Sequence, residues 1–142
     1  SAFFMAKAYV AALQPQKRPG RLVFFSSVAA GVGVANHAAI AVAKGGVEAL
    51  TRSLAADFSS IGLRVNAIAP GLMDTPATHK FVSNELSRKA VAAQYPLGRH
   101  GEAVDAAELA AFLISDAAGW VSGQVIALDG GFLAVRPTVK SG

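Results

Sequence analysis

The sequence predicts an α/β fold with a doubly wound parallel sheet. Short apolar segments rich in strand-forming residues alternate with longer Ala-rich segments of helical periodicity, which is typical of a parallel sheet with helices on both faces. The 142 residues are 53% hydrophobic and 15% charged, against about 25% charged in an average soluble domain, which excludes a disordered tail. A chain of this length is sufficient for one complete core.

The first two predicted elements are a helix and a buried strand. Residues 2–13 carry apolar side chains on most faces, which predicts a helix buried on more than one side, and the Pro-Gly pair at 19–20 follows its end. Residues 22–25, Leu-Val-Phe-Phe, form the continuous apolar run of a strand covered on both faces. Ser26 and Ser27 stand at its carboxyl end.

A long helix and a second strand follow. Residues 38–58 contain no proline, are rich in alanine and place apolar residues on one side, which predicts a helix. Gly45 and Gly46 in its middle each weaken a helix by about 1 kcal/mol relative to Ala, so we expect a close contact with another helix or strand there. Residues 63–69 predict a second strand, which Pro70-Gly71 ends.

The most polar segment of the chain comes next. Residues 73–95 are interpreted as a mobile helical excursion, and such excursions on α/β folds usually serve as lids. Residues 103–114 predict an amphipathic helix, and residues 124–128 predict a third short strand before Asp129-Gly130-Gly131. The uncharged run 22–43 is long enough to span a bilayer, but small and polar residues divide it into strand, loop and helix, so no membrane segment is expected.

Charge and residue types limit the partners and the compartment. Thirteen Lys and Arg against nine Asp and Glu give a net charge of +4, but these charges are scattered, so no nucleic-acid partner is expected. The absence of cysteine excludes a disulfide framework and a thiolate nucleophile, and a cytoplasmic protein is expected. No metal site is expected, because the three histidines have no carboxylates at ligand spacing. Ser1 resembles neither a signal peptide nor a translation start, so a partial chain is expected.

Four segments carry a pattern that is specific through its order and spacing. They are residues 23–27, residues 43–55 with Ala-Lys-Gly-Gly at the start, residues 64–71 with Pro-Gly at the end, and residues 122–131 with Asp-Gly-Gly at the end. In this order they resemble the short-chain dehydrogenase/reductase family, specifically the last three strands of its NAD(P)-binding Rossmann-type domain. The resemblance implies that residues 1–142 are one partial domain, with a lid at 73–95 and the N-terminal cofactor-binding half outside the chain.

The resemblance implies hydride transfer between NAD or NADP and a small alcohol or carbonyl substrate. Lys44 falls on the family's position for the nicotinamide ribose, and Ser27 on the position that orients the substrate oxygen. The family's catalytic Tyr would stand four residues before Lys44, where this chain has Ile40, which carries no proton to transfer. His37 shares a helix face with Ile40 and Lys44 and is the candidate acid; a water or a residue outside the chain are the alternatives.

The resemblance also implies cofactor contacts after the second strand and a self-assembling protein. In the family this stretch lines the nicotinamide, and here it contains Pro70, Gly71, Leu72, Met73 and Thr75. A homodimer or homotetramer is implied in the same way. Two alternatives stay open: a nicotinamide-binding pseudoenzyme or oligomer scaffold, which Ile40 favours, and a partial chain that binds no dinucleotide by itself.

Overall fold

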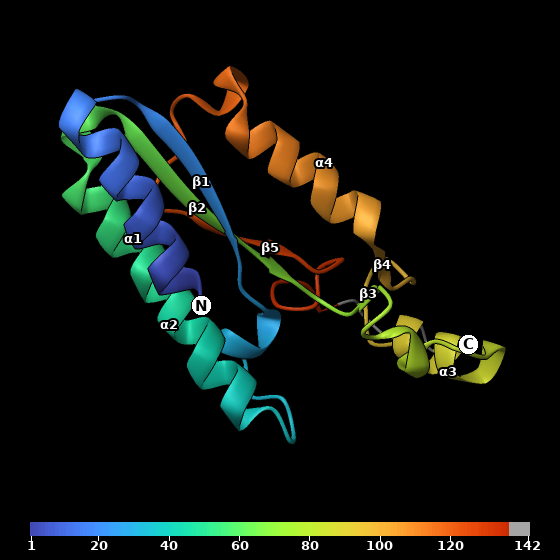
Figure 1. Cartoon of the computed structure of the whole chain (residues 1–142). Helices are drawn as coiled ribbons and strands as arrows, with labels where there is room; N and C mark the ends of the chain where they lie inside the picture. Colours follow the sequence, from blue (N-terminus) through green and yellow to red (C-terminus); the bar gives the residue numbers. More distant parts are fainter. Residues whose placement is uncertain (137–142) are drawn as a thin grey trace.

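A three-stranded parallel sheet is the centre of the computed structural model, which describes residues 1–136 (Figure 1). The strands are β1 (Gly20–Phe25), β2 (Leu63–Pro70) and β5 (Val125–Leu128), and β2 lies between the other two. In the register of the sheet, Gly20 pairs with Leu63 and Ala67 pairs with Val125. Every connection between these parallel strands contains a helix, which confirms the α/β prediction.

Helices cover both faces of the sheet. On one face lie α1 (Ala2–Leu13) and α2 (Ala38–Asp57), and on the other lies α4 (Ala103–Ile114) (Figure 1). Because successive strand residues point to opposite faces, the strands feed two cores. Val65 and Ala67 belong to the core with α1, whereas Ile68 of the same strand packs with Leu113 of α4. The sheet is therefore doubly wound, as predicted, and β2 is apolar because both of its faces are covered.

Two polar side chains of β2 fix the loop between α4 and β5. The Arg64 guanidinium donates to three backbone carbonyls at the end of α4 and in the following loop, at N···O distances of 2.9–3.2 Å. Asn66 is fully buried, donates to the Val121 carbonyl at 3.0 Å and accepts from the Gln124 N–H at 3.1 Å. These bonds satisfy a buried amide, so Asn66 has a structural role.

The segment 73–95 consists of three different elements and is not one helical excursion. Its first two residues form β3 (Met73–Asp74), which pairs in parallel with β4 (Gly101–Glu102) in a second small sheet. Its other two elements are the 3₁₀ helix η4 (His79–Phe81) and the α-helix α3 (Glu85–Ala92). Asn84 caps α3 by accepting a hydrogen bond from the Ser87 N–H at 2.9 Å. The prediction of a purely helical segment is wrong, because a two-residue strand is fixed by a distant partner and leaves no periodicity in the sequence. Short 3₁₀ helices complete the fold: η1 (Gln14–Gln16), η2 (Val28–Ala30), η3 (Ser59–Ile61), η4 (His79–Phe81) and η5 (Asp116–Ala118).

The two adjacent glycines of α2 face open space. A Cβ atom added to Gly45 or Gly46 would meet no atom within 4 Å in the described part of the chain. The predicted close contact is therefore not made within residues 1–136, and a contact of these glycines with a second copy of the chain stays a prediction. In the same range, no helix combines the length and the hydropathy needed to cross a bilayer.

Candidate functional site

A cleft of about 650 Å³ lies at the carboxyl ends of β1 and β2. Its volume falls in the range of about 300–1,000 Å³ that is usual for small-molecule sites. The walls come from η2, the start of α2, the loop after β2, the segment 73–95 and the start of α4. Ligands of open α/β sheets bind at this edge, where the strands end and the connecting loops diverge.

The predicted site residues converge on this cleft, with one exception. Side chains from four separate stretches of the sequence line it, because the parallel strands bring their carboxyl ends together. Lys44 is the exception, since it lies beside the cleft without lining it. The predicted residues that line it are Ser27, His37, Pro70, Gly71, Leu72, Met73 and Thr75, together with Ile40.

Lys44 is tethered to the last residue of β1. Its Nζ donates to the backbone carbonyl of Phe25 at 2.8 Å, and Phe25 itself lines the cleft. An ammonium group has three N–H donors, so this bond leaves two for other acceptors. The tether holds a positive charge at the margin of the cleft.

Ser27 combines a backbone role with a place on the cleft wall. Its Oγ accepts the Ala29 N–H at 3.2 Å and so caps η2. Within residues 1–136 the hydroxyl proton has no acceptor among the hydrogen bonds of Ser27. The cap therefore fixes the oxygen while leaving the O–H able to donate to a ligand.

His37 stands at the start of α2 and lines the cleft with Ile40, one helical turn further on. Its Nδ1 lies 2.7 Å from the Ala35 carbonyl. A carbonyl can only accept, so this contact assigns the proton of the neutral ring to Nδ1. The Nε2 atom of that tautomer is then a proton acceptor.

Ser26 and Glu48 form a link beside the site that the sequence analysis did not find. Ser26 is buried, and its hydroxyl donates to Glu48 Oε1 at 2.7 Å and contacts the Lys44 carbonyl at 3.4 Å. The link fastens β1 to the stretch of α2 that carries Lys44. Two signals were available: Ser26 and Ser27 follow directly after β1, where neighbouring side chains point to opposite sides, and Glu48 follows Lys44 by one helical turn.

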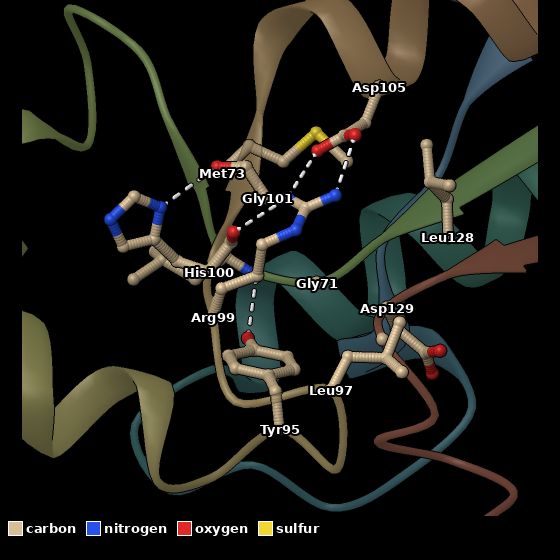
Figure 2. A pocket seen from close by; sticks show the side chains of 12 residues that line it. Gly71, Met73, Tyr95, Leu97, Arg99, His100, Gly101, Asp105, Leu128 and Asp129 are labelled. Atoms are coloured by element: carbon tan, nitrogen blue, oxygen red, sulfur yellow. Dashed lines mark hydrogen bonds and ion pairs between the residues drawn. The ribbon is translucent and has the colours of Figure 1, made fainter.

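Tyr95 fixes the loop after β2. Its hydroxyl accepts the Leu72 N–H at 2.6 Å, and a Cβ atom on Gly71 would lie only 2.8 Å from Cε1 of its ring (Figure 2). Gly71 therefore allows the close approach of the Tyr95 ring, and its predicted contact with a cofactor stays a prediction. The tilted ring of Phe132 packs against Tyr95, with centroids 5.5 Å apart.

Tyr95 lines this cleft and also a second cavity of about 90 Å³ (Figure 2). In this cavity the Arg99 guanidinium makes two bonds to the Asp105 carboxylate, at 2.7 and 2.8 Å. The Arg99 bonds, together with the Glu102 backbone N–H, lower the pKa of Asp105 to about 2. The carboxylate is satisfied by these partners and caps the start of α4.

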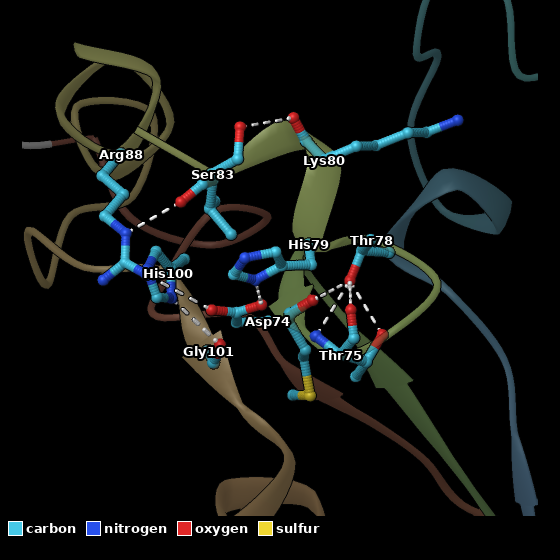
Figure 3. A network of polar contacts seen from close by, with 11 residues as sticks. Asp74, Thr75, Thr78, His79, Lys80, Ser83, Arg88, His100 and Gly101 are labelled. Carbon is cyan, nitrogen blue, oxygen red and sulfur yellow. Dashed lines mark hydrogen bonds and ion pairs between the residues drawn. The ribbon is translucent and has the colours of Figure 1, made fainter. Parts of the chain in front are cut away.

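Asp74 belongs to a polar cluster on the outer side of β3 (Figure 3). Its Oδ1 lies 2.9 Å from His79 Nδ1, and its Oδ2 lies 3.7 Å from Arg88 Nη2. The His79 hydrogen bond, supported by the charges of Arg88 and His100, lowers the pKa of Asp74 below its ordinary value. In residues 1–136 no group of three or more histidine, aspartate and glutamate side chains has the geometry to hold a metal ion.

A helix-covered parallel sheet with its cleft at the strand ends defines a Rossmann-type ligand-binding protein. Residues 1–133 match the family model described as enoyl-(acyl carrier protein) reductase. The chain therefore belongs to the short-chain dehydrogenase/reductase family.

Curated relatives and solved structures are similar over most of this chain. It is 44% identical to cis-4-hydroxycyclohexanecarboxylate dehydrogenase of Sinomonas cyclohexanicum, over 82% of this chain and 46% of that protein. It is 40% identical to 2-(S)-hydroxypropyl-CoM dehydrogenase 3 of Xanthobacter autotrophicus, over 94% of this chain and 53% of that protein. The crystal structure of a 2-deoxy-D-gluconate 3-dehydrogenase homologue from Agrobacterium tumefaciens with bound NADP superposes with a TM-score of 0.88 at 36% identity, over 94% of this chain and 55% of the other. The chain thus spans about half the length of the relatives that it matches.

Proposed function

We propose that this chain forms the substrate-side half of an NAD(P)-dependent oxidoreductase that acts on a small alcohol or carbonyl compound. The observation that carries the proposal is the convergence of Ser27, His37 and the loop 70–75 on one cleft, with the Lys44 ammonium at its margin. Dehydrogenases among the relatives and an NADP-bound structural neighbour support it. Residues 1–142 are then one partial domain, with residues 73–95 as the lid.

The residues of the cleft fit a nicotinamide nucleotide. The cleft has the volume of a small-molecule site, and the Lys44 ammonium keeps two donors for ribose hydroxyls. The backbone of Pro70, Gly71 and Leu72, held by Tyr95, forms the wall for the nicotinamide ring, with Met73 and Thr75 beside it. NAD or NADP, when bound, supplies or accepts the hydride.

The chain's own residues hold the substrate oxygen and its proton. Ser27 donates its free O–H to that oxygen, and the backbone bond from Ala29 keeps the serine oxygen in place. In the oxidation of an alcohol the neutral His37 ring accepts the substrate proton at Nε2 and becomes an imidazolium, and in the reduction of a carbonyl the imidazolium returns that proton from Nε2. Ile40 takes no part in proton transfer, since its side chain is a hydrocarbon.

A second candidate function is cofactor binding without chemistry. Ile40 is the observation that favours it, because it occupies the position where the family has its acid. In that case Lys44 and the loop 70–75 still hold the nucleotide. Measurement of cofactor binding and of turnover in the same preparation separates the two functions.

Assembly and location complete the proposal. A homodimer or homotetramer is supported by apolar side chains on the outer surfaces of α1 and α2, where Phe4 is 68% and Val42 is 79% exposed. A cytoplasmic location is supported by the absence of cysteine from the sequence.

The test is calorimetry of NADH and NADPH binding to the full-length protein and to its Lys44→Ala variant. Loss of a charge-assisted hydrogen bond, about 1.5–3 kcal/mol, weakens the preferred cofactor by about tenfold or more. Lys7→Ala is the control, because Lys7 is an exposed lysine of α1. Equal weakening in both variants, or no binding of either cofactor, contradicts the proposal.

A further inference from the structure

We infer that the cleft selects uncharged, largely apolar alcohols and ketones, and rejects substrates that carry a carboxylate, phosphate or sulfonate group. The inference rests on the proposed function, because it names the substrate class of the same site. Its basis is the way the segment 73–95 divides its side chains between the cleft and the outer surface.

The division begins on β3. Met73 and Thr75 line the cleft, whereas Asp74 between them points to the opposite side. There Asp74 is held by His79 at 2.9 Å and by Arg88 at 3.7 Å (Figure 3). Because neighbouring side chains point to opposite sides, Met73 and Thr75 lie on the cleft wall and the Asp74 carboxylate lies outside it.

The helix α3 continues the same division. Val91 lines the cleft, while the charged residues of this helix have partners elsewhere. Lys89 lies 3.4 Å from Glu85 on the exposed surface, and Arg88 reaches Asp74. The helix therefore turns an apolar residue toward the cleft and keeps its charges outside.

The residues of η4 and its N-cap follow this pattern. Thr78 and Phe81 line the cleft, whereas His79 bonds to Asp74 and Lys80 does not line the cleft. The Lys80 ammonium lies 5.0 Å from the centroid of the Phe81 ring and points away from the Asp74 cluster (Figure 3). The Phe81 ring contacts the Lys80 ammonium and also contributes apolar surface to the cleft.

No Asp, Glu, Lys or Arg side chain lines the cleft within residues 1–136. Several of its polar groups already have partners inside the protein: the Thr75 and Thr78 hydroxyls lie 2.8 Å apart, and the Tyr95 hydroxyl accepts the Leu72 N–H. The Lys44 ammonium at the margin of the cleft is assigned to the cofactor ribose. An anionic substituent that enters loses water and finds no cation on this wall, which is unfavourable, whereas an apolar substituent gains from leaving water. The remaining polar side chains are those of Ser27 and His37, which are assigned to the substrate oxygen, and the uncharged amide of Gln94, which donates to the Ala90 carbonyl at 3.5 Å.

The experiment compares two ketones, 4-oxocyclohexanecarboxylate and its methyl ester, which differ by one negative charge and one methyl group. Binding of each is measured by calorimetry to the full-length protein saturated with its preferred cofactor. The ester is expected to bind about tenfold or more tightly than the acid, because the unpaired carboxylate loses its hydration. Equal affinity, tighter binding of the acid, or no binding of the ester overturns the inference.

Variants locate the cause of the selection. Val91→Lys and Gln94→Lys each place a cation on the cleft wall, so both are expected to raise the affinity for the acid relative to that for the ester. Leu86→Lys is the control, because Leu86 is an 80% exposed residue of α3 that does not line the cleft, and it is expected to leave the ratio of the two affinities unchanged. Gln94 is exposed, so its replacement keeps the fold. An equal shift in all three variants overturns the inference, because the selection would then follow net charge. Cofactor binding is measured separately, so a failure of the proposed function is distinguishable from a failure of this inference.

Discussion

Ile40 is the residue on which the two candidate functions of the cleft differ. It lies on the cleft wall with 45% of its surface exposed, one helical turn after His37 and one turn before Lys44. A phenol at this position would share the cleft with Ser27, whose O–H has a fixed oxygen and an available proton. A hydroxyl introduced at residue 40 would therefore lie on the same cleft wall as Ser27 and His37.

We expect Ile40→Tyr to raise the turnover of a ketone by about 100-fold, the lower end of what a positioned acid contributes. The variant adds a proton donor next to Ser27 and leaves the cofactor wall unchanged. The measurement is NADPH oxidation under saturating conditions, with Ile40→Phe as the control that adds the ring without the hydroxyl. Equal rates for the two variants would show that the hydroxyl has no catalytic partner in the cleft.

The sequence predicted individual site residues where spacing along the chain is enough. Ser27, His37 and Ile40 were placed by counting along one strand and one helix, and the structure puts all three on the cleft wall. The Ser26–Glu48 and Tyr95–Leu72 contacts were not predicted, because each joins residues more than twenty positions apart whose distance depends on tertiary packing. The roles of the predicted residues stay predictions.

Among the elements, α4 is stabilised by the negative charge of Asp105 in its first turn. Asp105 accepts a hydrogen bond from the Glu102 N–H at 2.8 Å and two more from Arg99. It therefore caps the helix and also pairs with a cation. Negative charge at a helix N-terminus also interacts favourably with the helix dipole. These partners explain the lowering of the Asp105 pKa from 3.8 to about 2.

We expect Asp105→Asn to lower the free energy of unfolding by about 1 kcal/mol at neutral pH, after allowance for solvent screening. The folded-state pKa lies below the unfolded value, so this contribution is complete above about pH 4 and is lost as the pH falls through about 2. Urea denaturation over this range measures it. Glu85→Gln, in an exposed pair with Lys89, is the control and should change little. A pH-independent difference between wild type and Asp105→Asn would contradict the assignment.

The longer elements were predicted well because their signals are local. The helices at 2–13 and 103–114 agree with the structure, and β2 differs from its prediction by one residue. These segments have apolar faces that repeat over several turns or form a continuous buried run. The pairing of β3 with β4 was missed, because its two-residue strands carry no such repeat.

For the whole molecule, the outer surfaces of the first two helices carry several exposed apolar side chains. On α1, Phe3, Phe4 and Met5 are 56–74% exposed, and on α2 Val42 is 79% exposed. Gly45 and Gly46 leave the middle of α2 without side chains, so another backbone is able to approach it closely. These surfaces are suited to contact with a second copy of the chain.

We expect Val42→Glu to weaken self-association of the full-length protein by tenfold or more, because a carboxylate without a partner is unfavourable at an apolar interface. Light scattering over a dilution series measures the change in mass. Leu86→Glu is a matched control, since it adds the same charge as Val42→Glu. Leu86 on α3 is 80% exposed and Val42 is 79% exposed. If both variants dissociate equally, net charge is the cause; if only Leu86→Glu dissociates, the interface lies at the lid and would restrict access to the cleft. Dissociation of Val42→Glu alone assigns the interface to α2, the helix that also carries Lys44.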